Sequence, residues 1–239
     1  MIKQAINLFI SLKTAIWLLC LLIIMLLAGA VIMPANEEFQ SIHSVPMLEW
    51  INEQPVSLTW WLWSSIGLLV LLTANTLFCS IDSIIKKQKL TQWLLILSPQ
   101  IIHIGFLFIL LAHLFSSAQG YKGYSAAAEG TTLELKDKTV LHIKNIRISI
   151  DNKGYLNDWA VDAEYIAGGK TIKEDSIMPN KPSIYNGLGV YVKDLRAYPE
   201  KMVLLELSRE PGAVWALIGG LLFMIGTIML ITLKWKRDR

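Results

Sequence analysis

Hydrophobic residues are concentrated in four long stretches of the chain, and most charged residues lie between them. About 20 consecutive apolar residues are enough for a helix to cross the hydrocarbon core of a bilayer. The pattern therefore predicts four transmembrane α-helices, over residues 14–33, 58–81, 94–115 and 212–233. The first stretch is longer than the roughly 7–15 apolar residues of a typical signal peptide, so we interpret it as a retained helix.

Charged residues between these stretches predict how the helices are oriented. The link over residues 34–57 contains four glutamates and neither Lys nor Arg. Basic residues lie instead in the link between the second and third stretches and near both ends of the chain: Lys3, Lys13, Lys86, Lys87, Lys89, Lys234, Lys236, Arg237 and Arg239. Because basic segments stay on the cytoplasmic side, we expect a multi-pass membrane protein with both termini in the cytoplasm.

The segment between the third and fourth stretches has the short-period pattern of β-strands. Residues 139–150 alternate, with Val140, His142 and Lys144 on one side and Leu141, Ile143 and Asn145 on the other, and the pattern changes phase at Ile146. Two further runs, over residues 159–177, are joined at Gly168-Gly169, which is a hairpin signal. Similar runs follow over residues 188–198 and 201–209.

The predicted fold is an integral membrane protein with four transmembrane α-helices. An extracytoplasmic antiparallel all-β domain, on the periplasmic side, is inserted between helices 3 and 4. The predicted parts are an N-terminal membrane region with three helices, the β-domain, and a final helix with a basic cytoplasmic tail, over residues 1–115, 116–211 and 212–239. Trp60, Trp61 and Trp63 lie at the predicted outer end of the second helix, as interfacial anchors do.

Composition and motifs narrow the possible functions. Charged residues make up 17% of the chain, against about 25% in a typical soluble protein. The net charge of +3 is small, and without a recognised binding motif it gives no reason to expect nucleic acid as a partner. The two cysteines form no CxxC pair, and neither GxSxG, HExxH nor a P-loop motif occurs. No hydrolase, phosphotransferase or thiol-redox site is therefore predicted.

Two of the four histidines, His103 and His113, lie within the third predicted helix, where ionisable groups are costly and often functional. A separation of ten residues corresponds to about 15 Å along a helix and to different faces, so the two imidazoles do not hold one metal together. His113 lies near the predicted outer surface, within reach of water. For His103, in the inner half, two interpretations stay open: a structural hydrogen bond to another helix, or axial ligation of haem iron.

Several stretches follow one another in an order found in one family: LKTAIWLLCLLIIMLLAGAVIMP, SPQIIHIGFLFILLAHL, AAEGTTLEL, GYLND, NKPSIYNGLGVYV and EPGAVWALIGGLLFMIGTIML. In these stretches the chain resembles the ResB family (also called CcsB), membrane components of system II cytochrome c maturation. The resemblance implies a protein of the bacterial cytoplasmic (inner) membrane. It also implies a CcsA partner, with which haem is carried across the membrane and presented to apocytochrome c. His103, placed before Gly105 as in the family's third helix, would supply one axial ligand and CcsA the other. The sequence is short for the family, and we expect a short form in which CcsA is a separate chain.

We therefore expect a non-autonomous subunit of a cytochrome c synthase, rather than an enzyme alone. Haem b would be bound in transit at His103, with His113 as a weaker candidate for haem binding. The expected partners are a CcsA-like membrane protein, apocytochrome c and the lipid bilayer. Tyr185, Tyr191 and Arg196 are candidate docking residues in the β-domain. The alternative is a membrane-anchored extracytoplasmic binding or sensing module without haem, in which His103 only packs.

Overall fold

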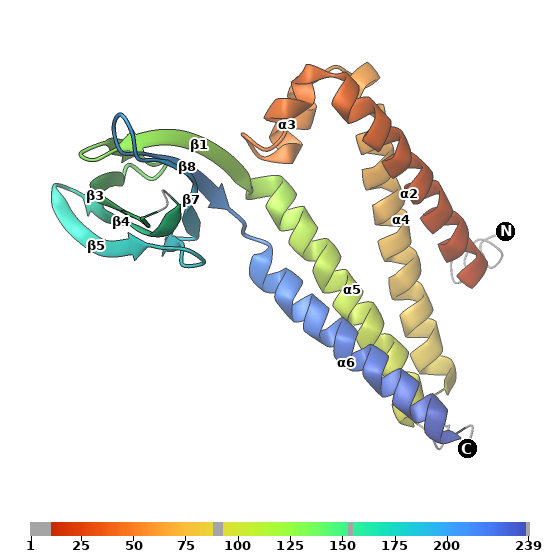
Figure 1. Ribbon diagram of the computed structural model, residues 1–239. Coiled ribbons are helices and arrows are strands. Elements are labelled where there is room, and N and C mark those ends of the chain that lie inside the picture. The colour runs from red at the N-terminus through yellow and green to blue at the C-terminus, as the bar shows by residue number, and fades with distance from the viewer. Residues whose placement is uncertain (1–10, 88–92, 153–154, 238–239) are drawn as a thin grey trace. The chain divides into compact units, whose positions relative to one another are not determined.

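The computed structural model describes residues 11–87, 93–152 and 155–237 (Figure 1). The chain divides into two compact units. A helical unit comprises Met1–Ile42, Pro46–Ala118 and Pro211–Arg239, and a β unit comprises His43–Val45 and Gln119–Glu210. Some residues used in the sequence analysis lie outside the described residues, namely Lys3, Lys89, Gly154 and Arg239.

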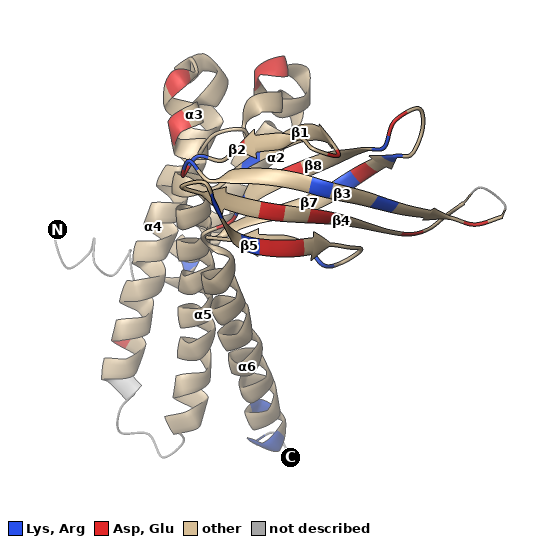
Figure 2. Ribbon diagram, turned by 90° about the vertical axis from the view of Figure 1, so that its left-hand side faces the viewer, with Lys and Arg blue, Asp and Glu red and all other residues tan. Residues whose placement is uncertain are grey.

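Long apolar helices make up most of the helical unit: α2 (Leu12–Ile32), α4 (Val56–Lys87), α5 (Trp93–Gln119) and α6 (Ala213–Arg237). In the described part of the chain these are the four helices long and apolar enough to cross a membrane. Figure 2 shows them almost without charged residues, whereas charges are common on the strands. The prediction of four apolar helices is confirmed. The acidic link forms two short 3₁₀ helices, η1 (Met33–Ala35) and η2 (Glu37–Ser41), and the short helix α3 (Met47–Glu53).

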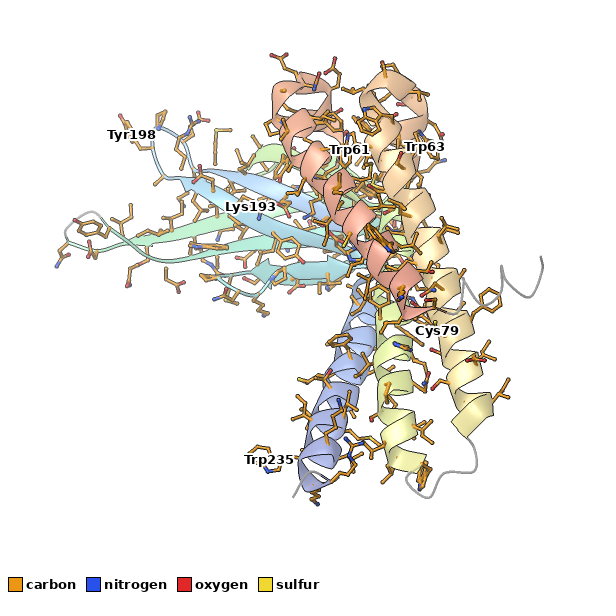
Figure 3. All side chains as sticks on the ribbon, turned by 90° about the vertical axis from the view of Figure 1, so that its right-hand side faces the viewer. Trp61, Trp63, Cys79, Lys193, Tyr198 and Trp235 are labelled. Carbon is orange, nitrogen blue, oxygen red and sulfur yellow. The ribbon has the colours of Figure 1, made fainter. Side chains whose placement is uncertain are left out.

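Helices α2 and α4 pack through a glycine and a tryptophan. A Cβ atom at Gly29 of α2 would overlap the ring of Trp61 on α4, so the ring lies directly on the α2 backbone (Figure 3). Trp61 is only 4% exposed, and Phe39 lies 6.2 Å from it between ring centroids. The prediction that Trp61 is an interfacial anchor is therefore wrong, because Gly29 opens a packing site for its ring. Trp60 and Trp63 are exposed.

Helices α5 and α6 run antiparallel and meet along a line of small residues, here called the glycine seam. It consists of Ser98, Gly105 and Ala112 on α5, and of Gly212, immediately before α6, with Gly219 and Gly226 on α6. Both sets are spaced by seven residues. A Cβ at Gly219 would lie 2.7 Å from the carbonyl oxygen of Gly105, and one at Gly226 would lie 3.1 Å from that of Ser98. Small residues let helix backbones approach closely, and the seven-residue period keeps one side of each helix on its partner.

The β unit contains two antiparallel four-stranded sheets. One has the strand order β1-β8-β7-β6 and the other β2-β3-β4-β5. The strands are β1 (Tyr121–Ala128), β2 (Thr132–Glu134), β3 (Val140–Ile150), β4 (Leu156–Ala167), β5 (Lys170–Ile177), β6 (Ser183–Tyr185), β7 (Leu188–Arg196) and β8 (Met202–Arg209). Buried side chains from both sheets form one core. The predicted antiparallel β-domain is confirmed, and it is a sandwich.

The hairpin predicted at Gly168-Gly169 is confirmed, and the phase change in the sequence of β3 has a structural cause. The phase change in β3 is a β-bulge, since the pairing with β4 shifts register between Ile143 and Asn145. The extra residue keeps Ile143 and Ile146 both in the core. Gly168 and Gly169 connect β4 to β5 with φ of +57° and +75°, which is the backbone of a type I′ hairpin turn.

A chain of hydrogen bonds connects the two sheets. Tyr165 of β4 is buried, and its hydroxyl donates to Ser183 Oγ of β6 over 2.8 Å. Ser183 Oγ in turn donates to Asp175 Oδ2 of β5 over 2.8 Å, and Lys173 Nζ lies 3.0 Å from the same oxygen. Burial raises the pKa of Asp175, but hydrogen bonds from Lys173, Ser183 and the Ser176 N–H outweigh it and hold that pKa below its ordinary value.

Candidate functional site

His103 lies on α5 and forms a hydrogen bond with α4. Its ring is partly buried, and Nδ1 lies 2.7 Å from Ser80 Oγ. The two residues are 23 positions apart in the sequence, so this contact joins one apolar helix to the next. The interhelical hydrogen bond that the sequence left open for His103 is therefore present.

This hydrogen bond gives Nδ1 a partner. Whether Nε2 can bind a metal depends on which of the two ring nitrogens carries the proton. If Nδ1 carries the proton, it donates to Ser80 Oγ and Nε2 keeps a lone pair for a metal. If Nδ1 accepts from the Ser80 hydroxyl, Nε2 carries the proton and does not bind a metal. Histidine ligands commonly donate their second N–H to a neighbouring acceptor, which orients the ring and makes it more basic. Ser80 is placed to do this for His103.

Polar groups accompany His103 in the helical unit. Gln100 lies one turn earlier on the same side of α5 and is 4% exposed. Among the described residues its Oε1 has no hydrogen-bond partner, although burying an unpaired acceptor is costly. The surroundings of His103 are therefore not uniformly apolar, because they include the unpaired Oε1 of Gln100.

The residues around His103 fit a single axial ligand to haem iron. An imidazole in a mostly apolar helix, with one nitrogen held by Ser80, is a suitable donor for iron. No cluster of three or more His, Cys, Asp or Glu able to hold a metal ion occurs within the described ranges. The site as described thus offers one imidazole, and a second axial histidine is not found in the other apolar helices.

The structure does not bring His113 to His103. His113 is exposed on α5, ten residues later. His43 is exposed in the helical link, and His142 is partly buried on β3.

Sequence reasoning missed Ser80, but a signal for it exists. Thr73, Thr76, Ser80 and Ser83 form a polar stripe at helical spacing on α4, and such a stripe in an apolar helix indicates a face turned away from lipid.

The three candidate docking residues of the β unit have different surroundings. Tyr185 stacks on Tyr165, with ring centroids 4.6 Å apart, and so belongs to the core packing. Tyr191 is 38% exposed on β7. Arg196 is exposed at the end of the same strand, and its guanidinium contacts Met202 Sδ.

Comparisons with known proteins add little to this geometry. No model of a known protein family matches the sequence, and no curated protein matches it. Among solved structures the chain is similar to one described as Cytochrome c Heme Lyase CcmF, with a TM-score of 0.45 and 14% sequence identity. The match covers 92% of this chain and 34% of that chain, so this protein spans about a third of its length. A likeness this distant does not establish function.

Proposed function

We propose that this protein is a membrane subunit of a cytochrome c maturation complex of the ResB/CcsB type. It would act with a CcsA-like partner to carry haem across the membrane and present it to apocytochrome c. Two things support the proposal: the order of the family-like stretches along the chain, and an imidazole within an apolar helix whose Nδ1 is held by Ser80. The geometry of His103 is the observation that carries it.

In this proposal the four apolar helices cross the cytoplasmic membrane with both termini inside. The distribution of Lys and Arg supports this orientation, because basic residues follow the positive-inside rule. The β unit then lies on the outer side, where apocytochrome c is completed. His103 Nε2 would ligate haem iron in transit, and the CcsA-like partner would supply the second axial ligand.

A second candidate function rests on the same hydrogen bond. If the Ser80 hydroxyl donates to Nδ1, His103 serves only to join α4 and α5. The protein would then be a membrane-anchored binding or sensing module without haem. The two proposals differ in whether Nε2 carries a metal.

The test is the absorption spectrum of the full chain, purified alone and after co-expression with a CcsA-like protein. We expect a Soret band that is lost in His103→Ala and is restored when imidazole is added, because free imidazole occupies the vacated ligand position. The matched control is His113→Ala, which removes an exposed histidine from the same helix and should leave the band in place. A colourless wild-type complex, or an undiminished band in His103→Ala, would refute the haem proposal.

A further inference from the structure

Strand β1 has an open outer edge. It pairs with β8 in continuous register from Tyr121↔Arg209 to Ala128↔Met202, and it is the outermost strand of its sheet. Backbone groups of alternate residues face the same side of a strand. The N–H of Lys122 donates to the carbonyl of His43, and that of Ala128 donates to Thr131 Oγ1. The even-numbered residues of β1 therefore present their N–H and C=O groups away from β8.

Two of these even-numbered residues lie between the occupied ends. Among the described residues, the backbone N–H groups of Tyr124 and Ala126 have no partner. Such an edge is a template for a further strand. The chain itself already places a backbone carbonyl, that of His43, at the beginning of this edge over 2.6 Å.

The other sheet edges of the β unit are protected. Strands β2 and β6 contain three residues each. Strand β5 carries Lys170, Lys173, Glu174 and Asp175, and its pairing with β4 contains a register shift. Short length, charge and irregularity are the usual protections of an edge. By contrast, Gly123–Ala128 is uncharged and regular.

We propose that the β1 edge binds an extended segment of apocytochrome c by strand addition; this inference rests on the proposed function. An unfolded chain can match donors and acceptors that repeat every two residues, whereas a helix cannot. The absence of charge on Gly123–Ala128 favours an uncharged segment. Tyr124 is 62% exposed and lies opposite Glu206, which in turn lies opposite Tyr191. An apolar or aromatic residue of the added strand would pack beside Tyr124 as the next member of this cross-strand row.

The test compares Ala126→Pro with Ala126→Ser in the full chain, purified in detergent. Proline removes an N–H that faces away from β8, so the β1–β8 hydrogen bonds remain, and serine keeps both the N–H and a small side chain. The probe is a labelled peptide of an apocytochrome c spanning its CxxCH motif, with both cysteines replaced by serine. Loss of this one hydrogen bond predicts an affinity up to about tenfold lower for Ala126→Pro and an unchanged affinity for Ala126→Ser. Tyr124→Ala, which keeps the backbone, should also weaken binding.

Far-UV circular dichroism and thermal melting establish that each variant is folded. A ¹³C-labelled peptide should show the infrared amide band of an intermolecular β-strand when bound. Equal binding by Ala126→Pro and Ala126→Ser, or binding without this band, would overturn the inference. So would an edge occupied by a second copy of this chain, seen as a dimer that Ala126→Pro dissociates. His103→Ala should bind the peptide as the wild type does, so a failure of haem binding and a failure of strand addition are separable.

Discussion

Replacing Gly219 by alanine tests how closely α5 and α6 approach at the glycine seam. The new Cβ would lie 2.7 Å from the carbonyl oxygen of Gly105 and 2.9 Å from the backbone nitrogen of Ile109. Ordinary contact distances are about 3.5 Å, so the helices must separate locally by about 0.8 Å. Because both obstructing atoms belong to the backbone, rotamer changes do not relieve the overlap. Overpacking of this kind costs about 1–3 kcal/mol.

The neighbouring glycine supplies the control. A Cβ at Gly220 meets nothing within 4 Å, so Gly220→Ala changes helix propensity without adding a clash. Both substitutions are in the interior of the same helix, and the propensity gain of up to about 1 kcal/mol cancels when they are compared. The expected difference in free energy of unfolding is therefore the steric cost alone, about 1–3 kcal/mol.

The measurement is unfolding of the purified chain by increasing sodium dodecyl sulfate in mild detergent, followed by the fluorescence of its nine tryptophans. We expect the order of stability to be Gly220→Ala first and Gly219→Ala last, with the wild type between them or close to Gly220→Ala. Equal stability of the two variants would show that α5 and α6 are not in backbone contact at this position, and the reasoning would be refuted.

Two further predictions concern the histidine site and the sandwich. Ser80→Ala should weaken haem binding about tenfold or more, because the imidazole that ligates the iron loses the partner that orients it. The control Ser64→Ala removes an exposed hydroxyl that bonds within its own helix and should leave haem binding unchanged. A haem titration in which the two variants bind equally would contradict this role of Ser80. Asp175 has a folded-state pKa below its ordinary value, so it stabilises the fold above the unfolded-state pKa of about 4 and loses that contribution as the pH falls further. Asp175→Asn should accordingly show lower stability than the wild type at neutral pH and a shallower loss of stability below about pH 4, measured by urea unfolding at several pH values.

The sequence predicts the element types well because their signals are local. Uncharged length marks each long helix. The Gly168-Gly169 pair marks a hairpin, because its positive φ angles favour glycine. The phase change in residues 139–150 marks an irregularity in the strand, which is the bulge. Tertiary packing is different. The residue type of Trp61 and its place in the sequence are those of an interfacial anchor. Only its contact with Gly29, in another helix, shows that it is buried.

The candidate site is predictable only in part for the same reason. His103 stands out because an imidazole is rare in an apolar helix, whereas Ser80 is one of several hydroxyl residues on α4 and becomes distinct only through its partner.

The pairing of β1 with β8 joins the first and last strands of the domain. No periodicity within either strand indicates that pairing, and the open β1 edge follows from it.

The end of α5 and the beginning of α6 lie next to each other in the helical unit. In the helical unit the Gly212 N–H donates to Ser116 Oγ, and in the β unit Tyr121 is paired with Arg209. The two ends of the segment between α5 and α6 are thus held together twice, independently of what that segment contains. We therefore expect that another domain whose own ends lie close together could replace the sandwich between α5 and α6, without changes to the packing of these two helices.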